Sequence, residues 1–409
     1  MLFIYNLILV FASQVVKILA LFSPKMKLFV DGRKEVFTIL QNKITPNDKT
    51  IWFHAASLGE YEQGLPVIEQ IKIKYPEHKI VVTFFSPSGY EVRKNNTITD
   101  LTIYLPLDTK HNARLFVELV HPEMAFFIKY EFWSNYLNEL KKRSIKTYLI
   151  SGIFRKKQAF FKSYGGFYRN ALKTFDYFFV QNESSKKLLQ SIGFNNVKIS
   201  GDTRFDRVVS ILERDNSLYF IEQFKDQKTT IVIGSSWPKD ENLLVNYINN
   251  SPDNVKFIIA PHNIKSEQIQ ELKNSITKKT ILFSEKENQN LSEFQVFIID
   301  NIGILTKIYS YAEIAYVGGG FGNPGVHNIL EPATFGVPII IGPYYSHFAE
   351  ATALVHQEGC ISISNQKELN EALDNLIYNE EIRHEKGHIC ATFVQMNKGA
   401  TEIILNTIY

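Results

Sequence analysis

The sequence has little of the chemistry that marks metal, redox or nucleic-acid proteins. Its two cysteines, Cys360 and Cys390, show neither metal-ligand nor redox spacing, so we expect two buried thiols in a reducing compartment. The formal net charge of +3 at pH 7 is too small to indicate a nucleic-acid partner. The chain has no convincing internal repeat and no long low-complexity tract, which excludes a repeat architecture and a largely disordered chain.

What is present is the composition of an ordinary globular protein, with 45% hydrophobic and 21% charged residues. A chain of 409 residues exceeds the usual size of a single core, so two domains are expected. Short apolar segments alternate with amphipathic ones, which predicts α/β architecture with parallel sheets. The expected strands are 51–55, 80–85, 124–128, 147–150 and 177–180 in the first half, and 230–233, 256–260, 296–299, 314–317 and 338–341 in the second.

The domain organisation follows from this pattern. We expect an N-terminal segment at 1–24, a first domain at 25–210, a second domain at 211–385, and a C-terminal helix at 386–409 that packs back on the first domain. Open α/β sheets bind ligands at the carboxyl ends of their strands, and most of the polar motifs below follow a strand. Two Rossmann-like domains are therefore expected to face each other across a ligand-binding cleft.

Residues 1–24 form an apolar segment with few polar side chains. Its polar residues are Asn6, Ser13, Gln14 and Lys17. At about 100° per residue these fall within roughly a third of a helix circumference. A cleaved signal peptide is disfavoured because a basic start and a small-residue cleavage site are both poor. A spanning helix would place a lysine in the membrane, so an anchor helix lying in one leaflet fits best. Basic residues within 25–34 place the body on the cytoplasmic side.

The most informative segment is 318–343, GGGFGNPGVHNILEPATFGVPIIIGP. It indicates a strand exit, a glycine-rich loop, a helix over 327–336 and a further strand. Glycines such as Gly319 let backbone N–H groups approach a phosphate, and a helix N-terminus attracts an anion. On that helix Asn328 and Glu331 would share one face, where a carboxylate can accept bonds from ribose hydroxyls. The segment therefore predicts a nucleotide site.

The same glycines match a dinucleotide motif, and this match is misleading. Gly320, Gly322 and Gly325 fit G-x-G-x-x-G, but that motif belongs after the first strand of a βαβ unit, with an acid about 20 residues further on. Here it comes late in the chain and includes Pro324. NAD and FAD are therefore disfavoured, and a turn that merely needs glycine is the plainer alternative.

Strand 51–55 leads into the first candidate catalytic cluster, which contains His54, Ser57, Gly59 and Glu60. Glu60 would sit at the start of the next helix. It could act as a general base on a hydroxyl, or it could simply complement the helix dipole, and both alternatives fit the sequence equally. In either case the dipole is expected to hold the pKa of Glu60 low.

Further polar turns follow the next strands of the first half. Ser86, Ser88 and Gly89 form a hydroxyl- and amide-rich turn that also fits a helix N-cap. Glu131 follows strand 124–128. It is a candidate for the floor of the cleft, or else a surface acid beside a core tryptophan.

Three more candidates come later in the chain. Arg204 could stabilise a phosphate leaving group or form an interdomain salt bridge. Ser235 and Ser236 precede a helix, as a phosphate cradle would. Pro261 and His262 follow the next strand, although a lone histidine is more often structural than functional.

Nine segments can be compared with known families by order and spacing. They are HAASLGE (54–60), TFFSPSG (83–89), YLPLD (104–108), EFWSN (131–135), GDTRFD (201–206), GSSWPKDE (234–241), APH (260–262), DNIGIL (300–305) and GGGFGNPGVHNILEPA (318–333). Together they resemble the 3-deoxy-D-manno-octulosonic acid (Kdo) transferases of lipopolysaccharide synthesis. The resemblance covers the chain from the end of the N-terminal segment to about residue 350.

The resemblance implies a GT-B fold and inverting transfer of Kdo from CMP-Kdo to an anionic lipid A precursor, with no metal or other cofactor. Glu60 would be the general base, and Glu131 and Arg204 would support the transition state. The CMP site would contain Pro261, His262, Gly303, Ile304, Leu305, Asn328 and Glu331. The turns with Ser57, Gly59, Ser86, Ser88, Gly89, Ser235, Ser236 and Gly319 would contact substrate. The enzyme would act on the cytoplasmic face of the inner membrane.

Four positions depart from the family pattern. Lys129 stands where an acid is usual, Arg204 replaces lysine, His262 replaces arginine, and Ile304 replaces glutamate. The catalytic and ribose carboxylates remain, which indicates variation within the family. Basic residues in 141–143 and 155–157 could steer the acceptor phosphates or form an ordinary solvated surface. The alternatives are another GT-B enzyme that uses a UDP-sugar, as a transferase or epimerase, and an inactive membrane-surface binding protein.

Overall fold

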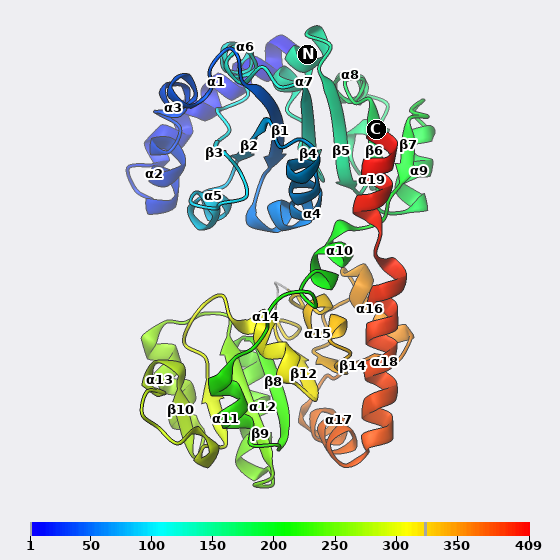
Figure 1. The fold of residues 1–409 in the computed structure, drawn as a ribbon. Coiled ribbons are helices and arrows are strands. Elements are labelled where there is room, and N and C mark those ends of the chain that lie inside the picture. Colours follow the sequence, from blue (N-terminus) through cyan, green and yellow to red (C-terminus); the bar gives the residue numbers. More distant parts are fainter. Residues whose placement is uncertain (1, 323–324) are drawn as a thin grey trace. The chain divides into compact units, whose positions relative to one another are not determined.

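A computed structural model describes residues 2–322 and 325–409 and divides into two α/β domains (Figure 1). The first domain contains the chain up to Arg207 together with Lys398–Tyr409, and the second contains Val208–Asn397. The first junction lies close to the expected boundary at 210. The return to the first domain comes later than the expected residue 386, because a C-terminal helix of the second domain extends past that position.

The first domain is built on a seven-stranded parallel sheet in the order β3, β2, β1, β4, β5, β6, β7. Its strands are β1 (Lys49–Ala55), β2 (His78–Phe84), β3 (Leu101–Tyr104), β4 (Met124–Ile128), β5 (Lys146–Gly152), β6 (Tyr177–Val180) and β7 (Val197–Ile199). The chain steps outwards from β1 to β3 and then returns to place β4 on the other side of β1. This makes a switch point between β1 and β4, where open α/β sheets bind their ligands.

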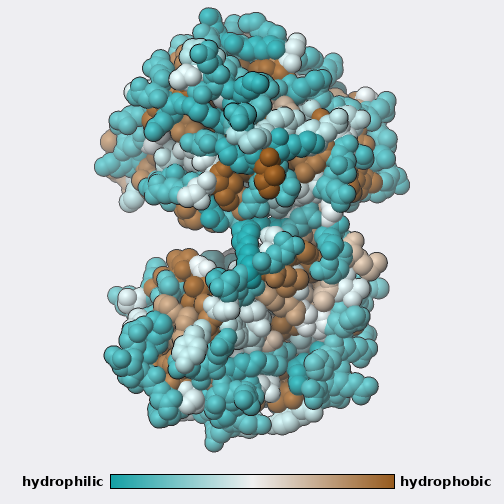
Figure 2. All heavy atoms as spheres, viewed as in Figure 1, coloured by the Kyte–Doolittle hydropathy of each residue, from teal (hydrophilic) through white to brown (hydrophobic). Residues whose placement is uncertain are grey.

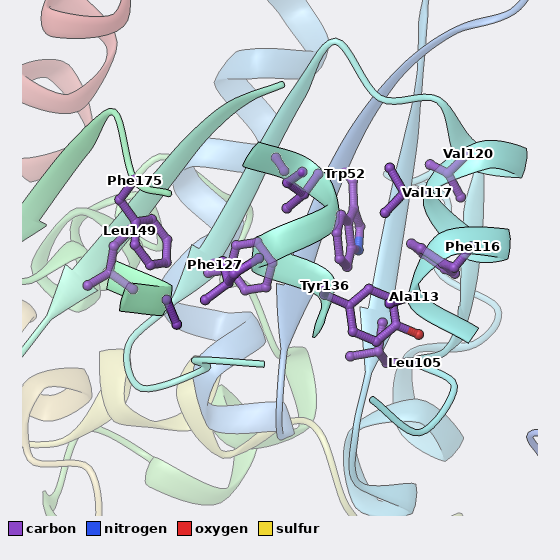
Figure 3. Packing of buried hydrophobic residues seen from close by; sticks show 14 of the residues in the cluster. Trp52, Leu105, Ala113, Phe116, Val117, Val120, Phe127, Tyr136, Leu149 and Phe175 are labelled. Carbon is purple, nitrogen blue, oxygen red and sulfur yellow. The ribbon is translucent and has the colours of Figure 1, made fainter. Parts of the chain in front are cut away.

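Helices cover the faces of this sheet, because parallel strands are usually buried on both sides. They are α1 (Leu2–Leu19), α2 (Pro24–Asp31), α3 (Val36–Lys43), α4 (Leu58–Lys74), α5 (Pro87–Arg93), α6 (Lys110–Val120), α7 (Ser134–Lys142), α8 (Gly166–Leu172), α9 (Glu183–Gln190) and α10 (Thr203–Val209). Figure 3 shows one core layer, in which Trp52 of β1 lies 4.9 Å from Phe116 and 5.1 Å from Phe127 between ring centroids. On the other face Phe53 stacks on Phe126 at 4.6 Å. Side chains that point to either face of the sheet are buried, which explains why the central strands are mostly apolar.

The second domain repeats this plan with a parallel sheet in the order β10, β11, β9, β8, β12, β13, β14. Its strands are β8 (Thr229–Ser236), β9 (Val255–Pro261), β10 (Thr280–Leu282), β11 (Val296–Ile298), β12 (Ile314–Val317), β13 (Ile339–Ile341) and β14 (Cys360–Ser362). Its helices are α11 (Tyr219–Lys225), α12 (Pro238–Asn250), α13 (Ser266–Ser275), α14 (Leu305–Ile308), α15 (Leu330–Thr334), α16 (Ala349–His356), α17 (Gln366–Tyr378) and α18 (Glu380–Asn397). The switch point of this sheet lies between β8 and β12.

The C-terminal segment is two helices rather than the single one expected over 386–409. α18 packs on α15 and α17 of the second domain, whereas α19 (Ala400–Ile408) packs on α4 of the first. Gly399, with φ of 105°, separates the two helices, because a residue in the left-handed region ends a helix. Asp206 stabilises the point where the chain re-enters the first domain. It accepts hydrogen bonds from the N–H groups of Gly399 at 2.5 Å and Thr401 at 2.7 Å.

Every strand expected from the sequence is present, with small shifts at its ends. The strands absent from the expected set include β3, β10 and β14, which are short and lie at sheet edges. The helix expected over 327–336 is shorter than predicted and begins only at Leu330. This correction matters for the site, because Asn328 then precedes the helix instead of lying on it.

The N-terminal helix α1 leaves its apolar side chains uncovered. Its exposed large hydrophobic residues are Leu2, Phe3, Ile4, Leu7, Ile8, Val10, Phe11, Val15, Ile18 and Leu19. None of its residues is buried, and its length and composition would allow it to cross a membrane. Hydrophilic residues cover most of the face of each domain seen in Figure 2. The composition of α1 is therefore unlike that of the face seen in Figure 2.

Candidate active site

In each domain the principal candidate residues lie at the switch point of the sheet, and the others follow neighbouring or edge strands. In the first domain Glu60 follows β1 and Glu131 follows β4, which are neighbouring strands. In the second domain Ser235 and Ser236 close β8, and the glycine loop follows its neighbour β12. Because parallel strands end at the same edge of a sheet, residues far apart in the chain come together at these two places.

Glu60 occupies the third position of α4 and closes a capping box with Ser57. Its Oε2 accepts hydrogen bonds from Ser57 N–H at 2.8 Å and from Ser57 Oγ at 2.9 Å. The expectation of a low pKa was wrong: burial raises the pKa of Glu60 above its ordinary value, and the nearby Glu131 carboxylate adds to that rise. The bonds from Ser57 and the charge of Lys129 oppose the rise. Glu60 is therefore both a helix cap and a carboxylate with increased basicity.

Glu131 lies in a cluster of aromatic donors and is not a surface acid. Its side chain is 12% exposed, and its Oε2 accepts a hydrogen bond from Trp133 Nε1 at 2.8 Å. The same oxygen lies 3.2 Å from Nε2 of His54, which is fully buried on β1. The alternative of a surface acid does not hold, the place of Glu131 in the site stays a prediction, and the sequence gave no sign of the contact with His54.

A strained backbone precedes Glu131 at the end of β4. Lys129 has φ of 70° and donates its N–H to Ile150 O at 2.9 Å. A positive φ is uncommon for a residue other than glycine and is often found at functional sites. The charge of Lys129 lowers the pKa of Glu60, so the residue that departs from the family pattern acts on the candidate base.

Arg204 joins this group from α10. Its Nε and Nη2 donate to Asp202 Oδ2 at 2.9 and 2.8 Å, which fixes the guanidinium on its own turn. Burial raises the pKa of Tyr130, while the charges of Arg155 and Arg204 oppose that rise and the charge of Glu60 adds to it. Tyr130 therefore lies within electrostatic reach of the candidate base and both arginines.

The turn after β2 is shaped by packing as well as by capping. Ser86 caps α5, accepting a hydrogen bond from Ser88 N–H at 3.3 Å, and the two hydroxyls lie 2.8 Å apart. A Cβ on Gly89 would lie 2.5 Å from Phe84 and 2.9 Å from Leu58 N, so glycine lets α5 approach the start of α4. By contrast, a Cβ on Gly59 would meet nothing within 4 Å.

In the second domain Asn328 and Glu331 form a joined pair before and within α15. Asn328 Nδ2 donates to Glu331 Oε1 at 3.0 Å, and Asn328 Oδ1 accepts from Leu330 N–H at 3.2 Å. Thr306 Oγ1, on α14, donates to Glu331 Oε2 at 2.9 Å. The expectation that the two residues share one helical face was wrong, because Asn328 precedes α15, and their bond is made across the helix start.

The DNIGIL segment (300–305) also lies near the glycine loop. Gly303 has φ of 101° and precedes Ile304, the N-cap residue of α14, and Leu305, its first residue. A Cβ at Gly234 would lie 3.2 Å from the Leu305 side chain. The end of β8 and the start of α14 are therefore in close contact, which brings these predicted residues to the glycine loop.

Asp240 holds the glycine loop in place, although it was not among the site residues expected from the sequence. Its Oδ2 accepts hydrogen bonds from Gly319 N–H at 2.9 Å and Trp237 N–H at 2.9 Å, and its Oδ1 accepts from Tyr316 Oη at 2.8 Å. Burial raises its pKa. Asp240 stands three residues after the N-cap Trp237, a capping spacing that could have indicated it. Pro324, inside the apparent dinucleotide motif, lies outside the described residues.

Three aromatic rings stack beside this loop. His262 lies 4.5 Å from Trp237 and 4.5 Å from His327 between ring centroids. Trp237 Nε1 donates to His327 Nε2 at 2.9 Å. Burial lowers the pKa of His262, and burial together with His262 lowers the pKa of His327 to about 4. Both imidazoles are therefore neutral near pH 7, so His262 does not act as a permanent cation in place of arginine.

The end of β8 bulges towards the same loop. Ser235 has φ of 54°, and the register with β9 shifts so that Ser236 pairs with Pro261. Ser236 Oγ donates to Glu241 Oε1 at 2.8 Å, and its carbonyl accepts from His262 N–H at 2.9 Å. The hydroxyl of Ser236 is already engaged in this local hydrogen bond. Backbone groups and Ser235 are the better candidates for a phosphate.

Two parallel-sheet α/β domains, each with polar groups at its switch point, define the GT-B class of glycosyltransferase fold. A solved structure with this fold is the UDP-GlcNAc 2-epimerase from Neisseria meningitidis, at a TM-score of 0.61, with 16% identity, 88% of this chain and 99% of that chain covered. At that identity the likeness concerns the fold alone.

Sequence comparison is more specific than the fold. Residues 31–207 match the family model described as 3-deoxy-D-manno-octulosonic-acid transferase (kdotransferase). The transferase of that name from Chlamydia trachomatis serovar D is 29% identical, covering 88% of this chain and 86% of the relative. The one from Haemophilus influenzae is 25% identical over 99% of this chain and 97% of the relative. Residues 31–207 are therefore a Kdo transferase domain by this family model, and most of the chain is similar to the Kdo transferases.

Proposed function

We propose that this chain transfers Kdo, with inversion, from CMP-Kdo to the hydroxyl of a phosphorylated lipid A precursor. The observation that carries the proposal is the pair Glu60 and Glu131 at the switch point of the first sheet. Both lie in segments that resemble the family motifs. The raised pKa of Glu60 favours a general base, because a base is most effective when its pKa approaches the working pH.

In the proposed reaction the acceptor hydroxyl gives its proton to Glu60. The hydroxyl oxygen forms a bond to the anomeric carbon of Kdo as the bond from that carbon to the phosphate oxygen of CMP breaks. The electron pair leaves with CMP, whose phosphate needs positive or dipolar partners. Because Ser57 already occupies Oε2 of Glu60, Oε1 is the oxygen assigned to accept the proton. Glu131 and Arg204 support the transition state from the same domain.

The second domain is assigned the CMP moiety. Glu331, which is bonded to Asn328 and Thr306, would exchange these bonds for those of ribose hydroxyls. The N–H groups of the glycine loop that Asp240 positions would receive the phosphate, as glycine-rich loops do. Ser235 and the neutral His262 would complete that site. Pro261, Gly303, Ile304 and Leu305 would form its walls.

The acceptor is a lipid with anionic phosphates, and two features of the first domain suit it. The uncovered apolar helix α1 would hold the enzyme at the inner membrane, on its cytoplasmic face. Arg155, Lys156 and Lys157 are exposed on the loop after β5 and would attract the phosphates. Arg143 is already paired with Glu139 at 2.9 Å, so the cluster at 141–143 is better explained as a solvated helix end.

The test is mass spectrometry of products formed from CMP-Kdo and a tetraacyl, bisphosphorylated lipid A precursor by the purified full-length protein. The proposal expects the lipid to gain the mass of one or more Kdo units. No gain in mass, together with thermal protection by UDP-sugars but not by CMP, would favour the UDP-sugar alternative. Thermal protection by CMP without any transfer would favour an inactive binding protein.

A further inference from the structure

The bond between Trp237 and His327 fixes the tautomer of a histidine beside the glycine loop. An indole N–H only donates, so His327 Nε2, which lies 2.9 Å from Trp237 Nε1, accepts this hydrogen bond and carries no proton. Burial and the neighbouring His262 lower the pKa of His327 to about 4, so the ring is neutral near pH 7. A neutral imidazole has one N–H proton. In His327 that proton is therefore on Nδ1.

The packing around His327 also fixes the orientation of its ring. The ring planes of His327 and Trp237 are 13° apart, and those of His327 and His262 are 30° apart. A Cβ added to Gly319 would lie 2.8 Å from Cδ2 and 3.3 Å from Nε2 of His327, so this edge of the ring faces the glycine loop. Nδ1 lies across the ring from that edge. The backbone is held as well, since His327 N–H donates to Gly318 O at 3.1 Å.

The proton on His327 Nδ1 is not used within the described part of the chain. Over residues 2–322 and 325–409, no side-chain or backbone acceptor bonds this nitrogen. It is not one of the buried atoms left without a partner, and the ring is partly exposed, so a ligand can reach it. A stack that only stabilised the fold would use Nε2 and the ring faces but not Nδ1. The open donor therefore indicates a role in binding a ligand.

The place of His327 in the proposed donor site indicates which kind of atom it binds. It lies between the glycine loop, which is assigned to the phosphate, and Asn328, which is assigned with Glu331 to the ribose. CMP-Kdo carries anionic oxygens on its phosphate and on its sugar carboxylate. A hydrogen bond from a neutral N–H to an ionised oxygen is roughly twice as strong as one between neutral groups. An anionic oxygen is therefore the acceptor that suits this donor best.

We propose that His327 binds an anionic oxygen of CMP-Kdo through its Nδ1–H, and that Trp237 is the positioning residue that keeps the proton on that nitrogen. The inference rests on the proposed function, because it assigns a further contact in the same donor site. The oxygen belongs either to the phosphate or to the sugar carboxylate, and both can accept from this donor. His327 thus supplies a directed hydrogen bond without a cation.

The first experiment measures the tautomer and needs no transfer activity. In a long-range ¹H–¹⁵N spectrum of histidine-labelled full-length protein, His327 is expected to show a protonated Nδ1 and an unprotonated Nε2. Its signals are assigned by their loss in His327→Gln, or in His327→Asn if the glutamine variant does not fold. Trp237→Phe keeps a ring in the stack but removes the indole N–H, so both nitrogens should move to intermediate values. A proton on Nε2 in the wild type, or nitrogens that W237F leaves unchanged, would overturn the proposal.

The second experiment compares two substitutions that each retain one side of the ring. In H327Q the amide reaches the position of Nε2 and can accept from Trp237, whereas in H327N it reaches the position of Nδ1 and can donate to the ligand. H327Q is expected to keep wild-type stability and to bind the donor about 10- to 100-fold more weakly. H327N is expected to lose stability and keep most of the affinity. His384→Gln is the control, because His384 on α18 is 75% exposed and should match the wild type in both.

Calorimetric titration with CMP and the KM for CMP-Kdo distinguish the two sources of the oxygen. Weaker CMP binding in H327Q assigns the oxygen to the phosphate. Unchanged CMP binding with a KM for CMP-Kdo raised about 10- to 100-fold assigns it to the sugar carboxylate. If H327Q does not fold, W237F replaces it, with a smaller expected loss because part of its His327 population keeps the proton on Nδ1.

Two results separate this inference from the proposed function. A folded variant that matches the wild type in both CMP binding and KM overturns the inference and leaves the proposed function standing. A wild-type protein that neither binds CMP nor transfers Kdo overturns both.

Discussion

Tyr5 Oη donates a 2.6 Å hydrogen bond to Asp108 Oδ2, and this bond joins the apolar helix α1 to the body of the first domain. Asp108 is buried and also accepts hydrogen bonds from the N–H groups of Asn135 at 3.1 Å and Tyr136 at 3.0 Å. Burial raises its pKa to about 6. Asn135 and Tyr136 lie in the first turn of α7, just after Glu131. Asp108 therefore links the helix proposed to lie in the membrane to the segment that carries a catalytic candidate.

The first prediction concerns this bond. Tyr5→Phe removes one donor from a buried carboxylate and should lower the free energy of unfolding by about 1–3 kcal/mol. Urea unfolding monitored by circular dichroism measures the change. Tyr164→Phe is the matched control, because Tyr164 is 68% exposed and its loss of a hydroxyl should change little. Equal stability of Y5F and wild type would contradict the role of Tyr5 as a tether.

The second prediction concerns the whole segment 1–24. None of the residues of α1 is buried, so its removal should leave both cores intact and give a folded protein that no longer sediments with membranes. The truncated protein should nevertheless be less stable than the full chain, because Asp108 loses its bond to Tyr5. Vesicle sedimentation and thermal unfolding give the two readouts. An unfolded or insoluble product would mean that α1 belongs to the core.

The third prediction distinguishes the cost of a positive φ from the cost of a steric clash, using Gly303 and Gly319. Gly319 and Gly303 both have positive φ, but a Cβ on Gly319 would lie 2.4 Å from Gly325 O, whereas one on Gly303 would meet nothing within 4 Å. Gly303→Ala should therefore cost roughly 1 kcal/mol from backbone strain alone, and Gly319→Ala should cost more and weaken CMP binding. Calorimetric titration with CMP and urea unfolding test this. Equal effects of the two substitutions would show that loop packing is not what Gly319 provides.

The fourth prediction is a pH dependence of stability. His327 has a pKa of about 4 when folded and about 6.5 when unfolded. The unfolded chain therefore binds the proton first, so stability is complete above pH 6.5 and is lost as the pH falls towards 4. Since the ring is partly exposed, we expect a loss of roughly 1–2 kcal/mol.

His327→Gln should remove most of that dependence, because its amide can still accept from Trp237 Nε1 but does not titrate. Urea unfolding at pH 7.5 and pH 5 provides the comparison. His347, an exposed histidine of the same domain, is the control, and His347→Gln should keep the wild-type dependence. A wild-type slope in H327Q would show that other groups cause the loss at low pH.

The fold could be predicted from the sequence because its central strands are buried on both faces. β4 is apolar throughout and β1 has an apolar centre at 51–53, and such segments between amphipathic stretches indicate a parallel sheet. The edge strands β3, β10 and β14 are only three or four residues long, so they left no comparable pattern. The limits of α15 were also unpredictable, because Asn328 bonds to the backbone of Leu330 and ends the loop there.

The candidate site residues were predicted from their positions at strand ends and beside glycines, and their roles stay predictions. Glu60, Glu131, Asn328 and Glu331 are all placed at switch points or beside the glycine loop. The predicted direction of the pKa shift of Glu60 was wrong, because burial and Glu131 outweigh the capping bonds. Neither of these two effects is visible in the sequence. The stack of Trp237, His262 and His327 was missed for a similar reason, since its members come from three distant segments.

Replacing Glu60 by glutamine shows whether this carboxylate is the general base of the proposed reaction. Glutamine preserves the capping box with Ser57 but does not take up a proton, so this variant separates the two roles better than Glu60→Ala. The measurement is the rate of Kdo transfer, alongside thermal stability and CMP binding. We predict a fall in transfer of about 10²- to 10⁴-fold with stability and CMP binding unchanged. Transfer at the wild-type rate, or joint loss of stability, CMP binding and transfer, would contradict the claim and leave Glu60 as a structural cap.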